Sequence, residues 1–132
     1  MNTQRILIQR IEDREAKVAI IGMGYVGLPL AVEFASAGLE TVGIDLSEEK
    51  VAQVNAGESY IADVPSIAVR DLVEAGKLRA TTEASALGEV DCICISVPTP
   101  LSKTKDPDIS YIVAACDMIV QYFRPGVLIV LE

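Results

Sequence analysis

Three glycines could bind a phosphate group through their backbone. Gly22, Gly24 and Gly27 stand at the spacing G-x-G-x-x-G within the stretch VAIIGMGYVGLPLA, residues 18–31. Gly22 permits a tight turn, Gly24 lets the backbone approach a pyrophosphate, and Gly27 lets a helix pack closely on the preceding strand. Such a turn binds an anion with amide groups and a helix dipole, without side-chain charge. The motif alone is weak evidence, because a purely structural strand-to-helix turn can carry the same glycines.

An acidic residue stands where the ribose of a dinucleotide would lie. Asp45 follows Gly24 by 21 residues and ends the second predicted strand, where a carboxylate can accept hydrogen bonds from the adenosine ribose. The same carboxylate repels a 2′-phosphate and therefore favours NAD over NADP. Asp45 could instead cap the next helix, but Ser47 already suits that position. Lys50 is the nearby cation, and it could contact ribose or phosphate or be a solvated helix residue.

The stretch ISVPTPL, residues 95–101, is a second candidate ligand-binding segment. A predicted strand ends at Val97 and runs into a loop fixed by prolines. In an open α/β sheet, ligands bind beyond the carboxyl ends of the strands, where the strand order reverses. We therefore expect Val97, Pro98 and Thr99 to lie beside the nicotinamide half of a dinucleotide. An ordinary rigid loop is the alternative interpretation.

These segments together predict a dinucleotide site for NAD. A structural turn, FAD and S-adenosylmethionine are the alternatives that the residues leave open. The expected cofactor-binding residues are Gly22, Met23, Gly24, Tyr25, Val26, Gly27, Asp45, Lys50, Val97, Pro98 and Thr99.

The surrounding pattern predicts an α/β fold with a doubly wound, mostly parallel sheet covered on both faces, as in Rossmann-type domains. Apolar runs and turn residues predict strands at 17–21, 41–45, 78–81, 91–97 and 127–131. Helical spacing and capping residues predict helices at 2–14, 28–37, 48–56, 65–75 and 109–123. We expect residues 1–14 to form a helix ahead of a single dinucleotide-binding domain at 15–132.

Composition narrows the class of protein. The chain has 132 residues, of which 51% are hydrophobic, enough for one domain with a proper core. Its formal net charge of -8 argues against nucleic acid and anionic membranes as partners. No apolar run approaches the roughly 20 residues of a membrane span, and the charged N-terminus does not resemble a signal peptide. We therefore expect a cytoplasmic protein.

The cysteines do not form an evident reactive centre. Cys92 and Cys94 lie two apart on a predicted strand, with Cα atoms roughly 6.5–7 Å apart, a poor separation for a disulfide. We interpret both as buried thiols, and Cys116 in its helical pattern likewise. The chain contains no histidine. We therefore expect neither a metal site nor a catalytic residue in this chain.

Several motifs in order resemble one known family. The stretches GMGYVGLPLAVEFASAG, GIDLSEEKV, GESYIADVPS and SVPTPLSKTKDPDISYI resemble the NAD-binding N-terminal domain of the UDP-glucose/GDP-mannose dehydrogenases. The resemblance covers nearly the whole chain. It is nearest to the branch that oxidises UDP-N-acetylglucosamine or UDP-N-acetylmannosamine at C6 in bacterial polysaccharide synthesis.

The resemblance implies an oxidoreductase that converts a UDP-sugar alcohol to the uronic acid with two NAD. It implies that the backbone from Gly22 to Gly27 holds the pyrophosphate, that Asp45 and Lys50 contact the adenosine ribose, and that the segment 97–99 contacts the nicotinamide ribose. The family's catalytic cysteine belongs to a later motif that nothing here matches. A homodimer or a higher homo-oligomer is expected of the full-length enzyme.

Two further readings remain open. The chain could be a free-standing NAD-binding or redox-sensing module that regulates a partner. It could also be the front half of another NAD-dependent hydroxyacid dehydrogenase, of the 6-phosphogluconate type. The sequence closes on the apolar stretch VLIVLE, residues 127–132, so we expect a fragment of a longer enzyme.

Overall fold

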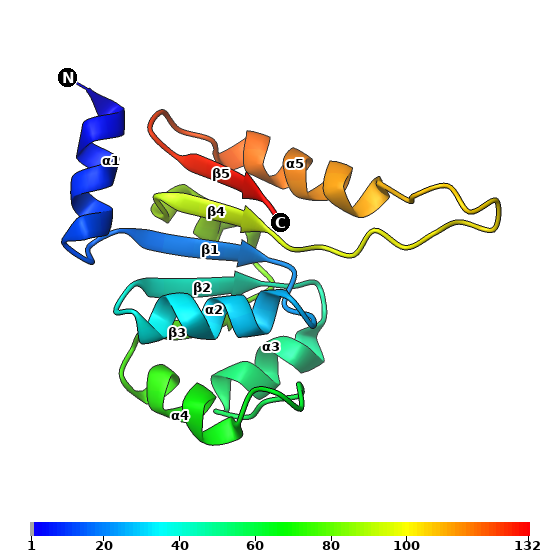
Figure 1. Ribbon diagram of the computed structural model, residues 1–132, viewed down its shortest axis with the longest axis horizontal. Coiled ribbons are helices and arrows are strands. Elements are labelled where there is room, and N and C mark those ends of the chain that lie inside the picture. The colour runs from blue at the N-terminus through cyan, green and yellow to red at the C-terminus, as the bar shows by residue number, and fades with distance from the viewer. Residues whose placement is uncertain (1) are drawn as a thin grey trace.

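One parallel sheet organises the chain. The computed structural model describes residues 2–132, and its five strands follow the order β3-β2-β1-β4-β5 (Figure 1). Every neighbouring pair is parallel, and the order reverses between β1 and β4. The predicted doubly wound α/β fold is therefore confirmed. The strands are β1 (Lys17–Ile21), β2 (Glu40–Ile44), β3 (Leu78–Thr81), β4 (Cys92–Ile95) and β5 (Leu128–Leu131).

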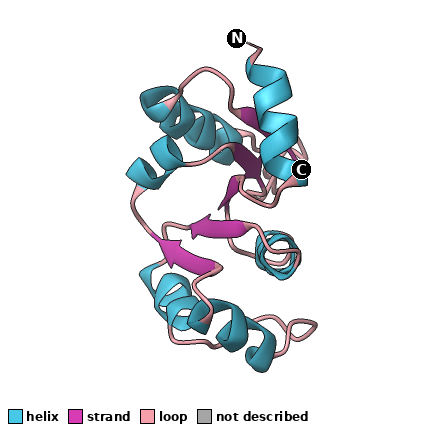
Figure 2. Cartoon of the chain, turned by 90° about the vertical axis from the view of Figure 1, so that its left-hand side faces the viewer, coloured by secondary structure: helices cyan, strands magenta, loops and turns pink. Residues whose placement is uncertain are grey.

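Helices connect the strands and lie on both sides of the sheet, as a view from the side shows (Figure 2). They are α1 (Thr3–Glu12), α2 (Gly27–Ser36), α3 (Glu48–Asn55), α4 (Ser66–Glu74), the 3-10 helix η1 (Ala84–Glu89) and α5 (Ser110–Tyr122). The α-helices match the sequence predictions to within a few residues. Element η1 was not predicted, because a single short turn does not establish a helical period.

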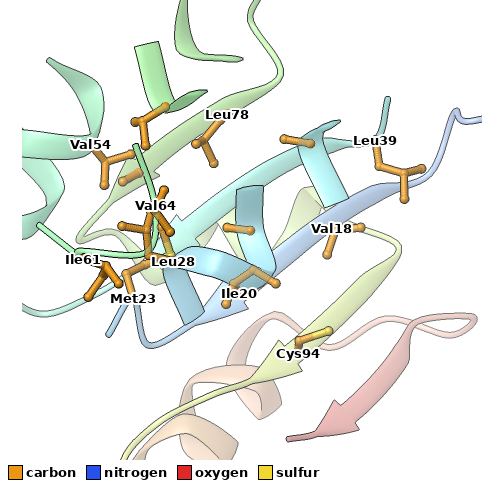
Figure 3. Packing of buried hydrophobic residues seen from close by; sticks show 14 of the residues in the cluster. Val18, Ile20, Met23, Leu28, Leu39, Val54, Ile61, Val64, Leu78 and Cys94 are labelled. Atoms are coloured by element: carbon orange, nitrogen blue, oxygen red, sulfur yellow. The ribbon is translucent and has the colours of Figure 1, made fainter. Parts of the chain in front are cut away.

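The two faces of the sheet bury separate clusters because successive strand residues point to opposite sides. Val18 and Ile20 of β1 join the cluster beneath α2, α3 and α4, part of which Figure 3 shows. Ala19 and Ile21 join the cluster beneath η1 and α5. Such continuous apolar runs are typical of strands buried on both faces.

Two strand predictions need correction. The strand predicted for 91–97 is shorter, because pairing with β1 ends at Ile95 and the chain then turns past Gly22. The expectation that both faces of the sheet are covered fails at β5. All four of its residues are exposed, with 37–61% of their surface accessible to solvent. Strand β5 lies at the edge of the sheet and pairs only with β4.

The cysteines also divide differently from the prediction. Cys92 and Cys94 are buried within the first cluster, as expected. Cys116 is exposed, so its predicted burial is wrong. It lies on the outer side of α5, whose inner side is occupied by Ala115 and Ile119. Apolar neighbours in sequence gave no information about which side of the helix faces the sheet.

A buried carboxylate ties the amino ends of the strands together. Asp91 accepts hydrogen bonds from the Lys17 amide at 2.8 Å and the Arg10 guanidinium of α1 at 3.1 Å, and Arg124 lies 3.5 Å away. Burial alone would raise the pKa of Asp91, but the amide and the two guanidinium groups hold that pKa below its usual value. Within residues 2–132, no helix is long and apolar enough to cross a membrane.

Candidate functional site

The three glycines of the turn between β1 and α2 are needed for three different reasons. Gly22 has a φ of 94°, and a Cβ there would lie 2.8 Å from the Ser96 carbonyl oxygen. A Cβ on Gly27 would overlap the Gly22 carbonyl, so α2 can begin this close to β1 only with glycine. A Cβ on Gly24 would meet nothing within 4 Å. The space beside Gly24 is therefore open for a ligand.

Asp45 is joined directly to this turn. Its Oδ2 accepts a hydrogen bond from the Met23 amide at 2.9 Å, and its Oδ1 accepts one from the Ser47 amide at 2.9 Å. Ser47 caps α3 by accepting from the Lys50 amide at 3.2 Å, as predicted. A carboxylate has about four lone-pair sites, so each oxygen of Asp45 retains the capacity to accept from a ligand hydroxyl.

A cleft of about 220 Å³ opens at the carboxyl ends of β1, β2 and β4. Five of the residues expected from the sequence line it, namely Gly22, Asp45, Lys50, Val97 and Pro98. Thr99 lies in the exposed loop between β4 and α5 and is not part of the lining. The remaining walls are mostly apolar and come from β1, the end of β2 and α5.

A second hollow of about 390 Å³ lies beside the first and includes Gly24, Tyr25 and Tyr60. Lys50 lines both hollows. Tyr25 is 86% exposed, and Val26 also faces solvent, while the side chain of Met23 is buried in the core. The open side of the turn is therefore formed by the backbone at Gly24 and by the exposed side chain of Tyr25.

The start of α2 has the character of an anion site. Helix α2 begins at Gly27 without a side-chain cap. The Leu28 amide donates to the Gly24 carbonyl at 3.1 Å, and the Leu30 amide donates to the Val26 carbonyl at 3.1 Å. Among the described residues, the amides of residues 24–27 have no backbone acceptor. The helix dipole adds a partial positive charge at this end. An open position at Gly24, the unpaired amides of residues 24–27 and an adjacent carboxylate together fit a phosphate joined to a ribose.

A family model for the "UDP-glucose/GDP-mannose dehydrogenase family, NAD binding domain" matches residues 16–132. The chain belongs to this family. UDP-N-acetyl-D-mannosamine dehydrogenase of Salmonella typhi is 39% identical over 117 residues, which are 87% of this chain and 27% of that protein. The NDP-N-acetyl-D-galactosaminuronic acid dehydrogenase of Ralstonia nicotianae is 40% identical with the same coverage.

Solved structures of the family have the same fold. The GDP-mannose dehydrogenase of Pseudomonas aeruginosa superposes with a TM-score of 0.83 at 30% identity, over 87% of this chain and 28% of that one. The NDP-N-acetyl-D-galactosaminuronic acid dehydrogenase of Methanosarcina mazei gives 0.82 at 30% identity, over 100% of this chain and 30% of that one. The present chain thus spans about a quarter of its curated relatives, at the family's NAD-binding domain.

Some residues of the cleft were missed in the sequence analysis. Tyr111, Ala114, Ala115 and Met118 of α5 form one wall. Their spacing places them on one face of a helix, which was a usable signal. Tyr60 lies in a segment that has no period and is brought to the turn only by the fold.

Another hollow, of about 470 Å³, lies at the opposite ends of the strands. Its charged residues include Asp91, which forms ion pairs with both Arg10 and Arg124. In this fold, ligands bind at the carboxyl ends of the strands. The smaller cleft beside the glycine turn is therefore the better candidate for the NAD site.

Proposed function

We propose that NAD binds across the glycine turn, with its adenosine ribose at Asp45. The observation that supports this proposal most is that Asp45 accepts a hydrogen bond from the Met23 amide, in the same turn where Gly24 faces open space. Because the carboxylate and the free amides adjoin, one ligand can meet both. The proposed cofactor-binding residues are Gly22, Met23, Gly24, Tyr25, Val26, Gly27, Asp45, Lys50, Val97, Pro98 and Thr99.

Each part of this site has a separate task. The amides from Gly24 onward hold the pyrophosphate, and Asp45 accepts from the ribose hydroxyls. A 2′-phosphate would meet the Asp45 carboxylate, so the site selects NAD over NADP. The apolar walls exclude water from part of the bound cofactor. When bound, NAD supplies the acceptor for a hydride.

The longer protein is proposed to be an NAD-dependent 6-dehydrogenase of a UDP-N-acetylhexosamine or related UDP-sugar. The names of its relatives and its partial coverage of their length support this proposal. The oxidation to a uronic acid would use a nucleophile outside this chain. We further propose that the enzyme works in the cytoplasm as a homodimer or higher homo-oligomer, in polysaccharide synthesis, without nucleic-acid or membrane partners.

A titration of NADH into the purified chain tests the proposed site. Nicotinamide fluorescence reports binding, and displacement by NAD but not by FAD or S-adenosylmethionine defines the ligand. Gly24→Val should abolish binding because its side chain would fill the open space. Gly88→Val is a matched control, since Gly88 is exposed and distant, and its Cβ would approach only Tyr122, at 4.0 Å. Equal binding by both variants would contradict the proposed site.

A further inference from the structure

Met23, between the first two glycines, is held by both of its backbone polar groups. Its amide donates to Asp45, and its carbonyl accepts a hydrogen bond from the hydroxyl of Tyr60. The Met23 side chain is buried and packs against Gly43, where any Cβ would collide with it. This residue therefore has little freedom to rotate.

The Tyr60 hydrogen bond fixes the peptide plane that joins Met23 to Gly24. In a trans peptide, the N–H points opposite to the C=O. The carbonyl of Met23 is directed at Tyr60, so the Gly24 amide is directed the other way. Accepting a hydrogen bond at the carbonyl also polarises the peptide and strengthens its N–H as a donor.

Tyr60 itself is firmly placed. The neighbouring Ile61 and Val64 belong to the same buried cluster as Met23, and Figure 3 shows Met23 and Ile61 at one end of that cluster. Ser59 binds the Ile61 amide through its hydroxyl at 3.1 Å, and its own amide donates to Ser66 at 3.0 Å. The hydroxyl of Tyr60 is thus held by a rigid segment, not by a mobile loop.

The surroundings keep Tyr60 a neutral donor. Burial, followed by the negative charge of Asp45, raises the pKa of Tyr60 to about 12. The ammonium of Lys50 lies 5.9 Å from the centre of the Tyr60 ring, within range of a cation–π contact. Tyr60 therefore contacts the glycine turn with its hydroxyl and Lys50 with its ring.

We propose that Tyr60 is a positioning residue that aims the Gly24 amide at the pyrophosphate of NAD. This inference rests on the proposed NAD site. Tyr60 contacts the turn through the Met23 carbonyl, and this role needs no contact with the cofactor. It acts by holding the turn in its binding conformation before the cofactor arrives, so that little ordering remains for binding to accomplish.

Tyr60→Phe tests this inference because it keeps the ring beside Lys50 and removes only the hydroxyl. We expect the Kd for NADH to rise roughly three- to tenfold, the range that corresponds to one net hydrogen bond. Tyr122→Phe is the matched control, since Tyr122 is a half-buried tyrosine packed against the other cluster. Its NADH affinity should equal that of the unchanged chain.

Amide NMR supplies a readout that needs no ligand. In Tyr60→Phe, the Gly24 amide proton should shift upfield and exchange faster, while Tyr122→Phe leaves it unchanged. A lower melting temperature with unchanged NADH affinity and an unchanged Gly24 amide would mean a merely structural role and would overturn the inference. If the unchanged chain bound no NADH, the proposed site would fail. If the unchanged chain binds NADH and Tyr60→Phe binds it with equal affinity, the role of Tyr60 is refuted and the proposed NAD site stands.

Discussion

Substitutions at Gly24 and Gly27 should have opposite effects on folding and binding. A valine at Gly24 enters open space, so the free energy of unfolding should change by no more than about 0.5–1 kcal/mol. Alanine at Gly27 forces α2 away from the Gly22 carbonyl, an overlap that costs about 1–3 kcal/mol or more. At about 3–5 °C per kcal/mol for a domain of this size, Tm should fall by about 3–15 °C.

The effects on NADH affinity should be reversed, with a larger loss in Gly24→Val than in Gly27→Ala. The valine side chain in Gly24→Val would keep the pyrophosphate away from the backbone amides. Loss of even one charge-assisted hydrogen bond, worth about 1.5–3 kcal/mol, should lower NADH affinity at least tenfold. Gly27→Ala should retain measurable NADH binding at a temperature where it remains folded. Thermal melts by circular dichroism and NADH fluorescence titrations measure both quantities on the same samples. A Gly24 variant that binds NADH normally, or a Gly27 variant as stable as the unchanged chain, would refute the reasoning.

Four other outcomes are expected. Asp45→Ala should weaken NADH binding and narrow the difference from NADPH, measured by paired titrations; equal affinities in the unchanged chain would contradict the role of Asp45. Asp91→Asn should lower Tm at pH 7 by several degrees. Because the pKa of Asp91 is lower in the folded chain, its contribution to the free energy of unfolding is fully present above the unfolded pKa of about 3.9. This contribution is lost as the pH falls below that value. The difference in Tm between Asp91→Asn and the unchanged chain should therefore shrink as the pH is lowered. Cys116 should react with a thiol reagent within minutes, whereas Cys92 and Cys94 should react only on unfolding; rapid labelling of all three would argue against the burial of this strand. Burial, and after it the negative charges of Asp91 and Cys94, raise the pKa of Cys92 to about 11, so this thiol is not a reactive thiolate at neutral pH. The purified chain should therefore produce no NADH from UDP-sugars. Turnover abolished by a serine at Cys92 or Cys94 would overturn that expectation.

The elements around the glycine turn could be predicted because each carries a local signal. The apolar run of β1, the glycine spacing and the position of Asp45 are encoded within a short stretch of chain. The helix ends are also local, since Gly38, Gly57 and Gly76 adopt positive φ just after the ends of α2, α3 and α4, a conformation that favours glycine. Parallel pairing of β1 with β4 followed from the rules of βαβ connection.

Other features depend on contacts between distant segments. Tyr60 reaches Met23 across 37 positions, and nothing in the residues around Tyr60 announces that partner. The exposure of Cys116 depends on how α5 is rotated against the sheet. The side chains of β5 look like core residues in sequence, because apolar composition alone does not distinguish an edge strand from a central one.

Amide chemical-shift mapping of the chain during a titration with NAD reports directly whether the cofactor binds at the glycine turn. We expect the largest shifts at Gly24 and Tyr25 of the turn, with further shifts at Leu46 and Val97. Residues at the opposite ends of the strands, such as Arg10, should not move. Shifts concentrated around Arg10 and Arg124, or no shifts at millimolar NAD, would contradict a cofactor site at the glycine turn.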